Sequence, residues 1–232
     1  MNKRHDDAFL ERREAARATL DHLPGNCANN SEGRLVFFDA VYEEAQGDEA
    51  AVPWADLEPK AYLVEWLKDN SGVGKKAVDI GCGLGDNAEA IAQAGYETTA
   101  FDIVEKAIEW AVQRFPKSDV AYRAADLFAP PEEWIGGFDF VHECYTLQAL
   151  PPDMVEETYA AICRLLAPSG TLLIFTRYRK DGVEVNGPPW ALEERLLDTP
   201  AAHGLIKMSE RRFDIKRRDN DVPHHLSLWQ KP

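Results

Sequence analysis

The residues that decide the fold of this chain are Ala77-Val78-Asp79-Ile80-Gly81-Cys82-Gly83-Leu84-Gly85-Asp86. An apolar run ends at an acidic residue, and three glycines then fall at every second position. This pattern predicts a strand over residues 77–80 and a helix over residues 86–94 that ends at Gly95. The glycines therefore stand where a strand turns into a helix. A backbone without Cβ atoms lets a ligand lie against it, and the free N–H groups of the helix start favour a negative group.

Regular alternation of strands and helices follows this turn. Further strands are expected over residues 97–101, 120–124, 138–143 and 171–178, and further helices over residues 104–114 and 153–166. Such alternation predicts an α/β fold with a doubly wound, mostly parallel sheet. Residues 212–216 and 226–230 predict two more strands with a polar turn between them, which suggests an antiparallel pair at the sheet edge.

The first 54 residues are expected to form a helical cap. Residues 3–22 are highly charged and predicted to be helical, and a polar break separates them from a second helical segment around residues 37–45. Another helix is expected over residues 57–69. We therefore expect an N-terminal helical cap or lid over residues 1–54 and the main domain over residues 55–232.

Composition excludes several classes of protein. Hydrophobic residues make up 45% of the 232-residue chain, but no run approaches the roughly 18 apolar residues that a membrane span needs. The formal net charge of −14 repels a phosphate backbone, so nucleic acid is not expected as a partner. The four cysteines are scattered without a Cys-x-x-Cys pair, which fits a reducing compartment. We expect a cytoplasmic monomer or homodimer without a membrane partner.

Three acidic residues follow three consecutive strands and indicate which ligand the turn holds. Asp79 can bind a cationic amine but would repel a pyrophosphate, and the G-x-G-x-G spacing differs from the dinucleotide fingerprint G-x-G-x-x-G. Asp102, about 20 residues later, can accept both hydroxyls of a ribose. Asp126 and Leu127 can meet an adenine amine and ring face. Glycines also serve tight bends without any ligand, but this set of acids favours S-adenosylmethionine.

The sequence resembles class I S-adenosylmethionine-dependent methyltransferases. The segments that carry the resemblance are Val78-Asp79-Ile80-Gly81-Cys82-Gly83-Leu84-Gly85, Phe101-Asp102-Ile103, Ala125-Asp126-Leu127 and Phe138-Asp139-Phe140-Val141. The resemblance covers roughly residues 55 to 232 and implies a Rossmann-like sheet of seven strands, the last of them antiparallel. The residues expected to bind the cofactor are Trp54, Asp79, Gly81, Cys82, Gly83, Gly85, Asp102, Ile103, Asp126, Leu127 and Glu143.

A narrower resemblance concerns the methyl acceptor. Val52-Pro53-Trp54 is similar to the entry segment of the thiopurine, thiol and tellurite methyltransferase group, in which the Trp sits near the methionine end of the cofactor. The sequence departs from characterised thiopurine enzymes around the fourth strand and after the fifth. This resemblance therefore does not identify the methyl acceptor.

Candidate acceptor residues follow the fourth predicted strand. His142 is a possible base or a strand histidine tied to a neighbour, and Glu143 can hold an amine or make a helix-terminus contact. Tyr145 either lines the acceptor pocket or packs. Arg177 and Arg179 follow the fifth strand, where they can bind an acidic acceptor or form salt bridges. The pair His224-His225 lacks a third ligand at suggestive spacing, so no metal is expected.

Several functions remain open at this point. A thiolate or other chalcogen nucleophile needs little base at neutral pH, whereas an amine must be deprotonated and a hydroxyl needs a stronger base or a metal. The leading hypothesis is methyl transfer to a small-molecule acceptor, possibly a thiol or other chalcogen, with S-adenosylhomocysteine as product. The alternatives are N- or O-methylation of a small metabolite, a non-catalytic cofactor-binding protein, and a nicotinamide oxidoreductase.

Overall fold

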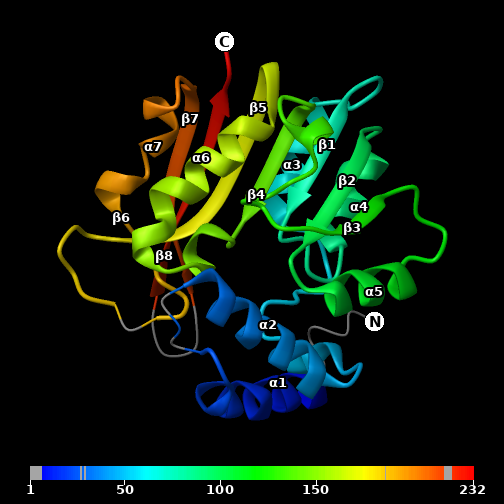
Figure 1. The fold of residues 1–232 in the computed structure, drawn as a ribbon, viewed down its shortest axis with the longest axis vertical. Coiled ribbons are helices and arrows are strands. Elements are labelled where there is room, and N and C mark those ends of the chain that lie inside the picture. The colour runs from blue at the N-terminus through cyan, green and yellow to red at the C-terminus, as the bar shows by residue number, and fades with distance from the viewer. Residues whose placement is uncertain (1–6, 27, 29, 186, 217–220) are drawn as a thin grey trace. The chain divides into compact units, whose positions relative to one another are not determined.

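A computed structural model gives the fold of the chain (Figure 1). The described residues are 7–26, 28, 30–185, 187–216 and 221–232. They group into two compact units, which are taken in turn below. The first unit runs up to Gly74 and from Cys82 to Ala125, and the second comprises Lys75–Gly81 and Asp126–Pro232.

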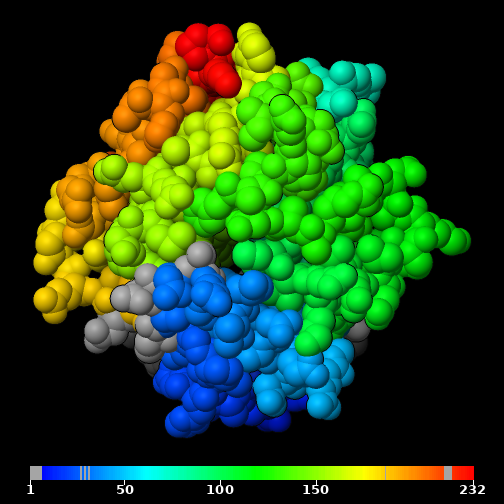
Figure 2. Space-filling view, viewed as in Figure 1, coloured from blue at the N-terminus to red at the C-terminus, as the bar shows by residue number. Residues whose placement is uncertain are grey.

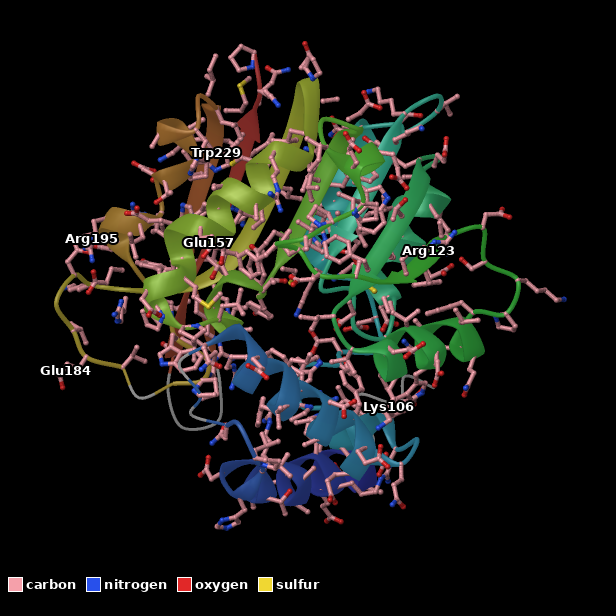
Figure 3. All side chains as sticks on the ribbon, viewed as in Figure 1. Lys106, Arg123, Glu157, Glu184, Arg195 and Trp229 are labelled. Carbon is pink, nitrogen blue, oxygen red and sulfur yellow. The ribbon has the colours of Figure 1, made fainter. Side chains whose placement is uncertain are left out.

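The first unit is mostly helical. Its elements are α1 (Asp7–Thr19), η2 (Leu20–His22), α2 (Ser31–Ala45), η3 (Glu49–Ala51), α3 (Ala61–Asp69), α4 (Asp86–Gln93), β2 (Glu97–Asp102), α5 (Glu105–Arg114) and β3 (Ala121–Ala124). Strands β2 and β3 pair in parallel, and Asp102 is the register partner of Ala124. Lys106, labelled in Figure 3, joins α5 to α2 through ion pairs with Glu43 and Asp39.

Helix α2 begins earlier than the segment expected around residues 37–45. The Asn30 side chain accepts a hydrogen bond from the backbone N–H of Gly33 at 2.8 Å, so Asn30 caps the helix start. Helix α3 instead begins later than expected, at Ala61. The N–H of Lys60, just before α3, donates to Asn87 Oδ1 at 2.9 Å.

The second unit carries most of the strands. Its elements are β1 (Lys76–Ile80), η4 (Glu132–Trp134), β4 (Phe138–Cys144), η5 (Leu147–Ala149), η6 (Pro152–Met154), α6 (Val155–Leu165), β5 (Leu166–Arg179), β6 (Leu192–Glu193), η7 (Glu194–Leu196), α7 (Thr199–Ala202), β7 (Ile206–Lys216) and β8 (Asp221–Gln230). Within the unit the strand order is β1-β4-β5-β8-β7, with β6 beside β5. The strands β1, β4 and β5 are parallel, and β8 is antiparallel to both β5 and β7.

The predicted fold class is confirmed. In the described residues, seven strands have four or more residues, and the two-residue β6 is an addition to the predicted seven. The predicted antiparallel pair at the chain end is also present, although β7 and β8 are longer than expected and β8 lies between β5 and β7. Helix α6 packs on β4 and β5 (Figure 1). In the space-filling view, side chains cover these strands (Figure 2).

The core of the second unit comes from its parallel strands. Most apolar residues of β1, β4 and β5 are almost fully buried, as expected for parallel strands covered on both faces. Trp229 of β8, labelled in Figure 3, is also buried and donates its indole N–H to Ser227 Oγ at 2.9 Å. None of the helices in the described part of the chain is both long and apolar enough to cross a membrane.

Candidate functional site

The three positions of the strand–helix turn are glycines for different reasons. All three have positive φ, at 60°, 52° and 90°, which favours glycine. A Cβ on Gly81 would lie 2.6 Å from Thr146 Oγ1, and one on Gly85 would collide with Tyr122 Oη. Protein packing therefore excludes a side chain at these two positions without any ligand. Around Gly83 a Cβ would find only ordinary van der Waals contacts, so protein packing does not by itself exclude a side chain there.

Two aromatic side chains lie against Gly83 in the first unit. A Cβ built on Gly83 would be 3.4 Å from Tyr42 Oη and 3.9 Å from Trp54 Cδ1. Trp54 Nε1 donates to Tyr42 Oη at 3.1 Å, and the two rings meet edge to face with centroids 5.9 Å apart. Burial, reinforced by the negative charge of Asp102, raises the pKa of Tyr42 well above its usual value. Trp54 was among the residues predicted to bind the cofactor, and Tyr42 was not.

Asp102 shapes the backbone of the same turn. Its Oδ2 accepts from the Gly83 N–H at 3.0 Å and its Oδ1 accepts from the Val104 N–H at 3.1 Å. A carboxylate oxygen can accept more than one hydrogen bond. The neighbouring Cys82 is held by its backbone N–H on the Phe101 carbonyl at 2.9 Å, with Cys82 itself partly buried. Ile103, which completes the predicted set in this unit, is 36% exposed.

A buried arginine holds the loop that carries Trp54. Arg13 of α1 is 7% exposed, and its guanidinium donates to the carbonyl of Val52 at 3.3 Å and to the carbonyl of Ala55. It also lies over the Phe9 ring, 4.7 Å from the centroid. Because these two carbonyls flank Trp54, α1 fixes the position of the loop within the first unit.

In the second unit, Asp79 and His142 form a buried pair. They are register partners on β1 and β4, and they are 1% and 0% exposed. His142 Nδ1 lies 2.6 Å from Asp79 Oδ1, so the ring donates its Nδ1 proton to the carboxylate. This is the geometry of a strand histidine tied to a neighbour, the second of the two readings from sequence. Among the described residues, Asp79 Oδ2 is buried and has no hydrogen-bond partner.

Glu143 combines a helix-terminus contact with a second buried oxygen. Its Oε1 accepts from the N–H groups of Thr146 at 2.7 Å and Leu147 at 3.0 Å. In the part of the chain that the structure describes, its Oε2 has no hydrogen-bond partner. Burial raises the pKa of Glu143 to about 8, the backbone N–H groups act against this rise, and the charge of Asp79 adds to it.

These two carboxylate oxygens are the feature that most needs a ligand. A buried acceptor without a partner costs free energy, and such groups are rare in folded proteins. Asp79 Oδ2 and Glu143 Oε2 stand at the carboxyl ends of the adjacent parallel strands β1 and β4, where α/β sheets bind ligands. An ammonium group, with three N–H donors and a positive charge, matches both oxygens. The residues present therefore fit the amino group of S-adenosylmethionine.

Asp126 and Leu127 begin the chain segment that follows β3. Asp126 Oδ1 accepts from the Phe128 N–H at 2.8 Å, which fixes the local turn. Leu127 is 6% exposed, and its carbonyl accepts from Arg164 at 3.0 Å. The second oxygen of Asp126 and the Leu127 side chain are the groups that can face an adenine.

Tyr145, the remaining acceptor candidate, contacts a histidine that the sequence connected only with a metal. Its hydroxyl lies 2.9 Å from His224 Nε2, and the Arg177 guanidinium lies over its ring at 5.8 Å from the centroid. No group of three or more histidine, cysteine or acidic side chains that could hold a metal ion occurs among the described residues. Of the two arginines after the fifth strand, Arg179 forms an ion pair with Glu193 at 3.4 Å.

Gln148 is a further residue that sequence reasoning missed. It is 3% exposed, and its Oε1 accepts from the Arg177 N–H at 2.6 Å, while its carbonyl accepts from the Trp190 N–H at 2.7 Å. Gln148 therefore ties the segment after β4 to the end of β5 and to the Trp190 loop. A lone glutamine carries no sequence signal for such a role.

The chain is similar to known methyltransferases. Residues 77–170 match the model of a family described as a methyltransferase domain. The ubiquinone biosynthesis O-methyltransferase of Methylococcus capsulatus is 36% identical over 165 residues, which cover 68% of this chain and 62% of that protein. The protein of the same name from Pseudomonas entomophila is 33% identical over 183 residues, which cover 77% of this chain and 72% of that protein.

A solved structure gives the same fold. The N-methyltransferase NodS from Bradyrhizobium japonicum WM9, in complex with S-adenosylhomocysteine, superposes with a TM-score of 0.61 at 19% identity. The superposition covers 95% of this chain and 98% of that one. Among the first curated relatives, the matched part of the chain spans between 49% and 62% of their length.

Proposed function

Because the chain belongs to the class I S-adenosylmethionine-dependent methyltransferases, we propose that it transfers a methyl group from S-adenosylmethionine to a hydroxyl oxygen of a small molecule. The curated relatives are O-methyltransferases by name, which favours an oxygen acceptor. The thiol or chalcogen acceptor expected from Pro53-Trp54 becomes the second candidate. The observation that favours it is the position of Trp54 against Gly83.

The observation that carries the proposal is the pair of buried carboxylate oxygens, Asp79 Oδ2 and Glu143 Oε2. We assign them to the amino group of the cofactor. When bound, S-adenosylmethionine supplies a methyl carbon on a positively charged sulfur, and the C–S bond breaks with its electron pair left on sulfur, giving S-adenosylhomocysteine. In this assignment His142 orients Asp79 through their hydrogen bond and does not act on the acceptor.

The remaining cofactor contacts are assigned by the groups that each residue presents. We assign the Asp102 carboxylate to the ribose hydroxyls and Asp126 with Leu127 to the adenine. Gly83 offers backbone on which packing forces no clash, with Trp54 beside it. Cys82, Gly81 and Gly85 shape the turn. The division into a cap over residues 1–54 and a cofactor-binding domain over residues 55–232 is part of the same proposal.

Tyr145 is the residue that we assign to the acceptor. It is partly exposed and directly follows β4, so it stands at the carboxyl end of that strand, the end at which we expect the small molecule. A phenol or catechol acceptor must lose its O–H proton during attack, and a positioned base assists this step. A thiol acceptor would need no such group, because thiolates are present near neutral pH.

The experiment that tests the proposal measures S-adenosylhomocysteine release by the full chain over a panel of phenols, catechols, alkanethiols and amines at pH 8. We expect turnover with members that carry a hydroxyl on an aromatic ring. Turnover confined to thiols would replace the oxygen acceptor with the sulfur acceptor. Cofactor binding without any turnover over an extended panel would favour a non-catalytic binding protein.

A further inference from the structure

We propose that His224 is a positioning residue for methyl transfer to oxygen, acting through Tyr145. It accepts the hydrogen bond of the Tyr145 hydroxyl and so prepares the Tyr145 oxygen to receive the proton of the acceptor's O–H group. The inference rests on the proposed function, since only an oxygen acceptor needs this proton removed.

The backbone directs Tyr145 toward β8. Tyr145 has φ of 71°, a left-handed conformation that is unfavourable for a residue with a side chain. Its N–H is held by the Phe175 carbonyl at 3.0 Å. In this conformation the Tyr145 hydroxyl lies 2.9 Å from His224 Nε2. Backbone strain of this kind persists where surrounding contacts enforce it, and it clusters at functional sites.

The hydrogen bonds of His224 define which ring nitrogen carries the proton. Its Nδ1 lies 2.7 Å from the carbonyl oxygen of Val222, which can only accept, so Nδ1 is protonated. In the neutral ring, Nε2 is then the acceptor, and the Tyr145 O–H donates to it. A hydroxyl that donates its proton can also accept, so the Tyr145 oxygen can accept from a substrate hydroxyl.

Packing holds the His224 ring in place. The side chain is fully buried and stacks on Phe175, with centroids 5.2 Å apart, and on Phe213, with centroids 6.3 Å apart. Phe175 also contacts the Tyr145 ring, with centroids 5.1 Å apart. A fixed acceptor nitrogen gives the Tyr145 hydroxyl one defined direction, which is what a positioning residue supplies.

The charged groups around the pair act in opposite directions, because a cation favours negative charge on the Tyr145 oxygen and disfavours positive charge on the His224 ring. Arg177 of β5, the register partner of His224, lies over the Tyr145 ring and stabilises negative charge on its oxygen. On β7, Arg211 lies over the Phe213 ring at 5.5 Å from the centroid. Glu210, on the same strand, contacts the neighbouring His225 at 3.5 Å.

The proton transfers balance as follows. The acceptor's O–H proton moves to the Tyr145 oxygen while the Tyr145 proton moves to His224 Nε2, and the freed electron pair on the acceptor oxygen forms the new bond to the methyl carbon. The Val222 carbonyl stabilises the resulting imidazolium through the Nδ1 proton. After product release the proton returns from Nε2 through the partly exposed Tyr145 to solvent.

The test compares His224→Gln with Tyr145→Phe over a series of substituted phenols at pH 8. A glutamine can accept the Tyr145 hydrogen bond but cannot take a proton. With phenols whose pKa is about 10, we expect kcat/KM to fall about 100-fold in both variants. With 4-nitrophenol, which is largely ionised at this pH, we expect a fall of no more than about threefold, because no proton must be removed.

Three further measurements separate this role from a structural one. The double variant should lose no more activity than Tyr145→Phe alone, because both residues act in one relay. S-adenosylhomocysteine affinity should stay as in the unchanged protein. The control His225→Gln alters the adjacent buried histidine, which contacts Glu210, and should leave the dependence on phenol pKa unchanged.

An equal loss of activity with every phenol in the series, or no loss with any, would overturn the role of His224 while leaving O-methylation intact. Failure of the unchanged protein to methylate any phenol, with turnover of thiols, would instead overturn the proposed function and this inference together.

Discussion

His142 Nδ1 of β4 lies 2.6 Å from Asp79 Oδ1 of β1, and both side chains are buried. The bond fixes one oxygen of Asp79 and leaves the other, Oδ2, pointing at no partner among the described residues. Glu143 repeats this arrangement one position after His142 on β4, with Oε1 bound to backbone N–H groups and Oε2 without a hydrogen-bond partner in the part of the chain that the structure describes. Two carboxylates, each oriented through one oxygen, present the other oxygen to a ligand.

Asp79→Asn should therefore weaken cofactor binding. The variant keeps an oxygen that can accept from His142, but it removes the negative charge offered to the ammonium group. Loss of a charge-assisted hydrogen bond costs about 1.5–3 kcal/mol, or roughly 10- to 100-fold in affinity for S-adenosylhomocysteine measured by calorimetry. The matched control is Asp139→Asn, which alters a carboxylate of β4 that accepts from the Lys76 N–H at 2.8 Å. Equal affinities for both variants would contradict the assignment.

The raised pKa of Glu143 predicts an unusual dependence of the unfolding free energy on pH. Burial raises its pKa from 4.5 to about 8, so the folded protein holds this proton while the unfolded chain releases it. The stabilisation is complete below the unfolded pKa and is lost as pH rises through the folded pKa. Between about pH 5.5 and 7.5, the free energy of unfolding should lose up to about 1.4 kcal/mol per pH unit through this group.

Glu143→Gln provides the comparison for this slope. The variant cannot ionise, so the difference in unfolding free energy between it and the unchanged protein should grow with pH over this range, measured by urea denaturation. Saturating S-adenosylhomocysteine should reduce the difference, because an ammonium beside Glu143 favours its ionised form. A difference that stays constant across the range would show that Glu143 does not titrate there.

Arg13 should contribute far more stability than its neighbour Arg12. Arg13→Ala removes the guanidinium donor from the buried carbonyls of Val52 and Ala55, of which Val52 keeps a backbone donor, at a cost of about 3 kcal/mol. Arg12 instead forms an exposed ion pair with Asp48 at 2.9 Å, and Arg12→Ala should cost no more than about 1 kcal/mol. Urea denaturation of both variants measures the two effects. Similar losses would mean that Arg13 does not support the loop.

Much of the fold can be predicted from the sequence because the strands of a buried parallel sheet are nearly continuous apolar runs. The start of β7 is different. Ile206 and Met208 are exposed on a strand whose other residues are mostly charged, so neither burial nor alternation marks it. Only its pairing with β8 makes residues 206–211 a strand, and that pairing depends on segments distant in sequence.

The residues of the candidate site also differ in how far local sequence predicts their positions. Asp79, Asp102 and Glu143 follow or end strands, so their placement at strand ends is predictable from the apolar runs before them. The contact between Tyr145 and His224 joins residues 79 positions apart and depends on the register of β8 against β5. No local pattern contains that register, and for this reason the sequence connected His224 only with a metal.

The three glycines supply the last prediction, since the structure gives them different roles. Gly85→Ala forces a Cβ against Tyr122 Oη and should cost about 2–4 kcal/mol of stability through crowding and positive φ. Gly83→Ala meets no such obstacle and should cost only about 1–2 kcal/mol of conformational strain. Its methyl group, however, would occupy backbone that we assign to the cofactor. S-adenosylhomocysteine affinity should therefore fall more in Gly83→Ala than in Gly85→Ala. The unfolding free energy should instead fall more in Gly85→Ala than in Gly83→Ala. If Gly85→Ala showed the larger loss of affinity and Gly83→Ala bound normally, the cofactor would not approach the backbone at Gly83.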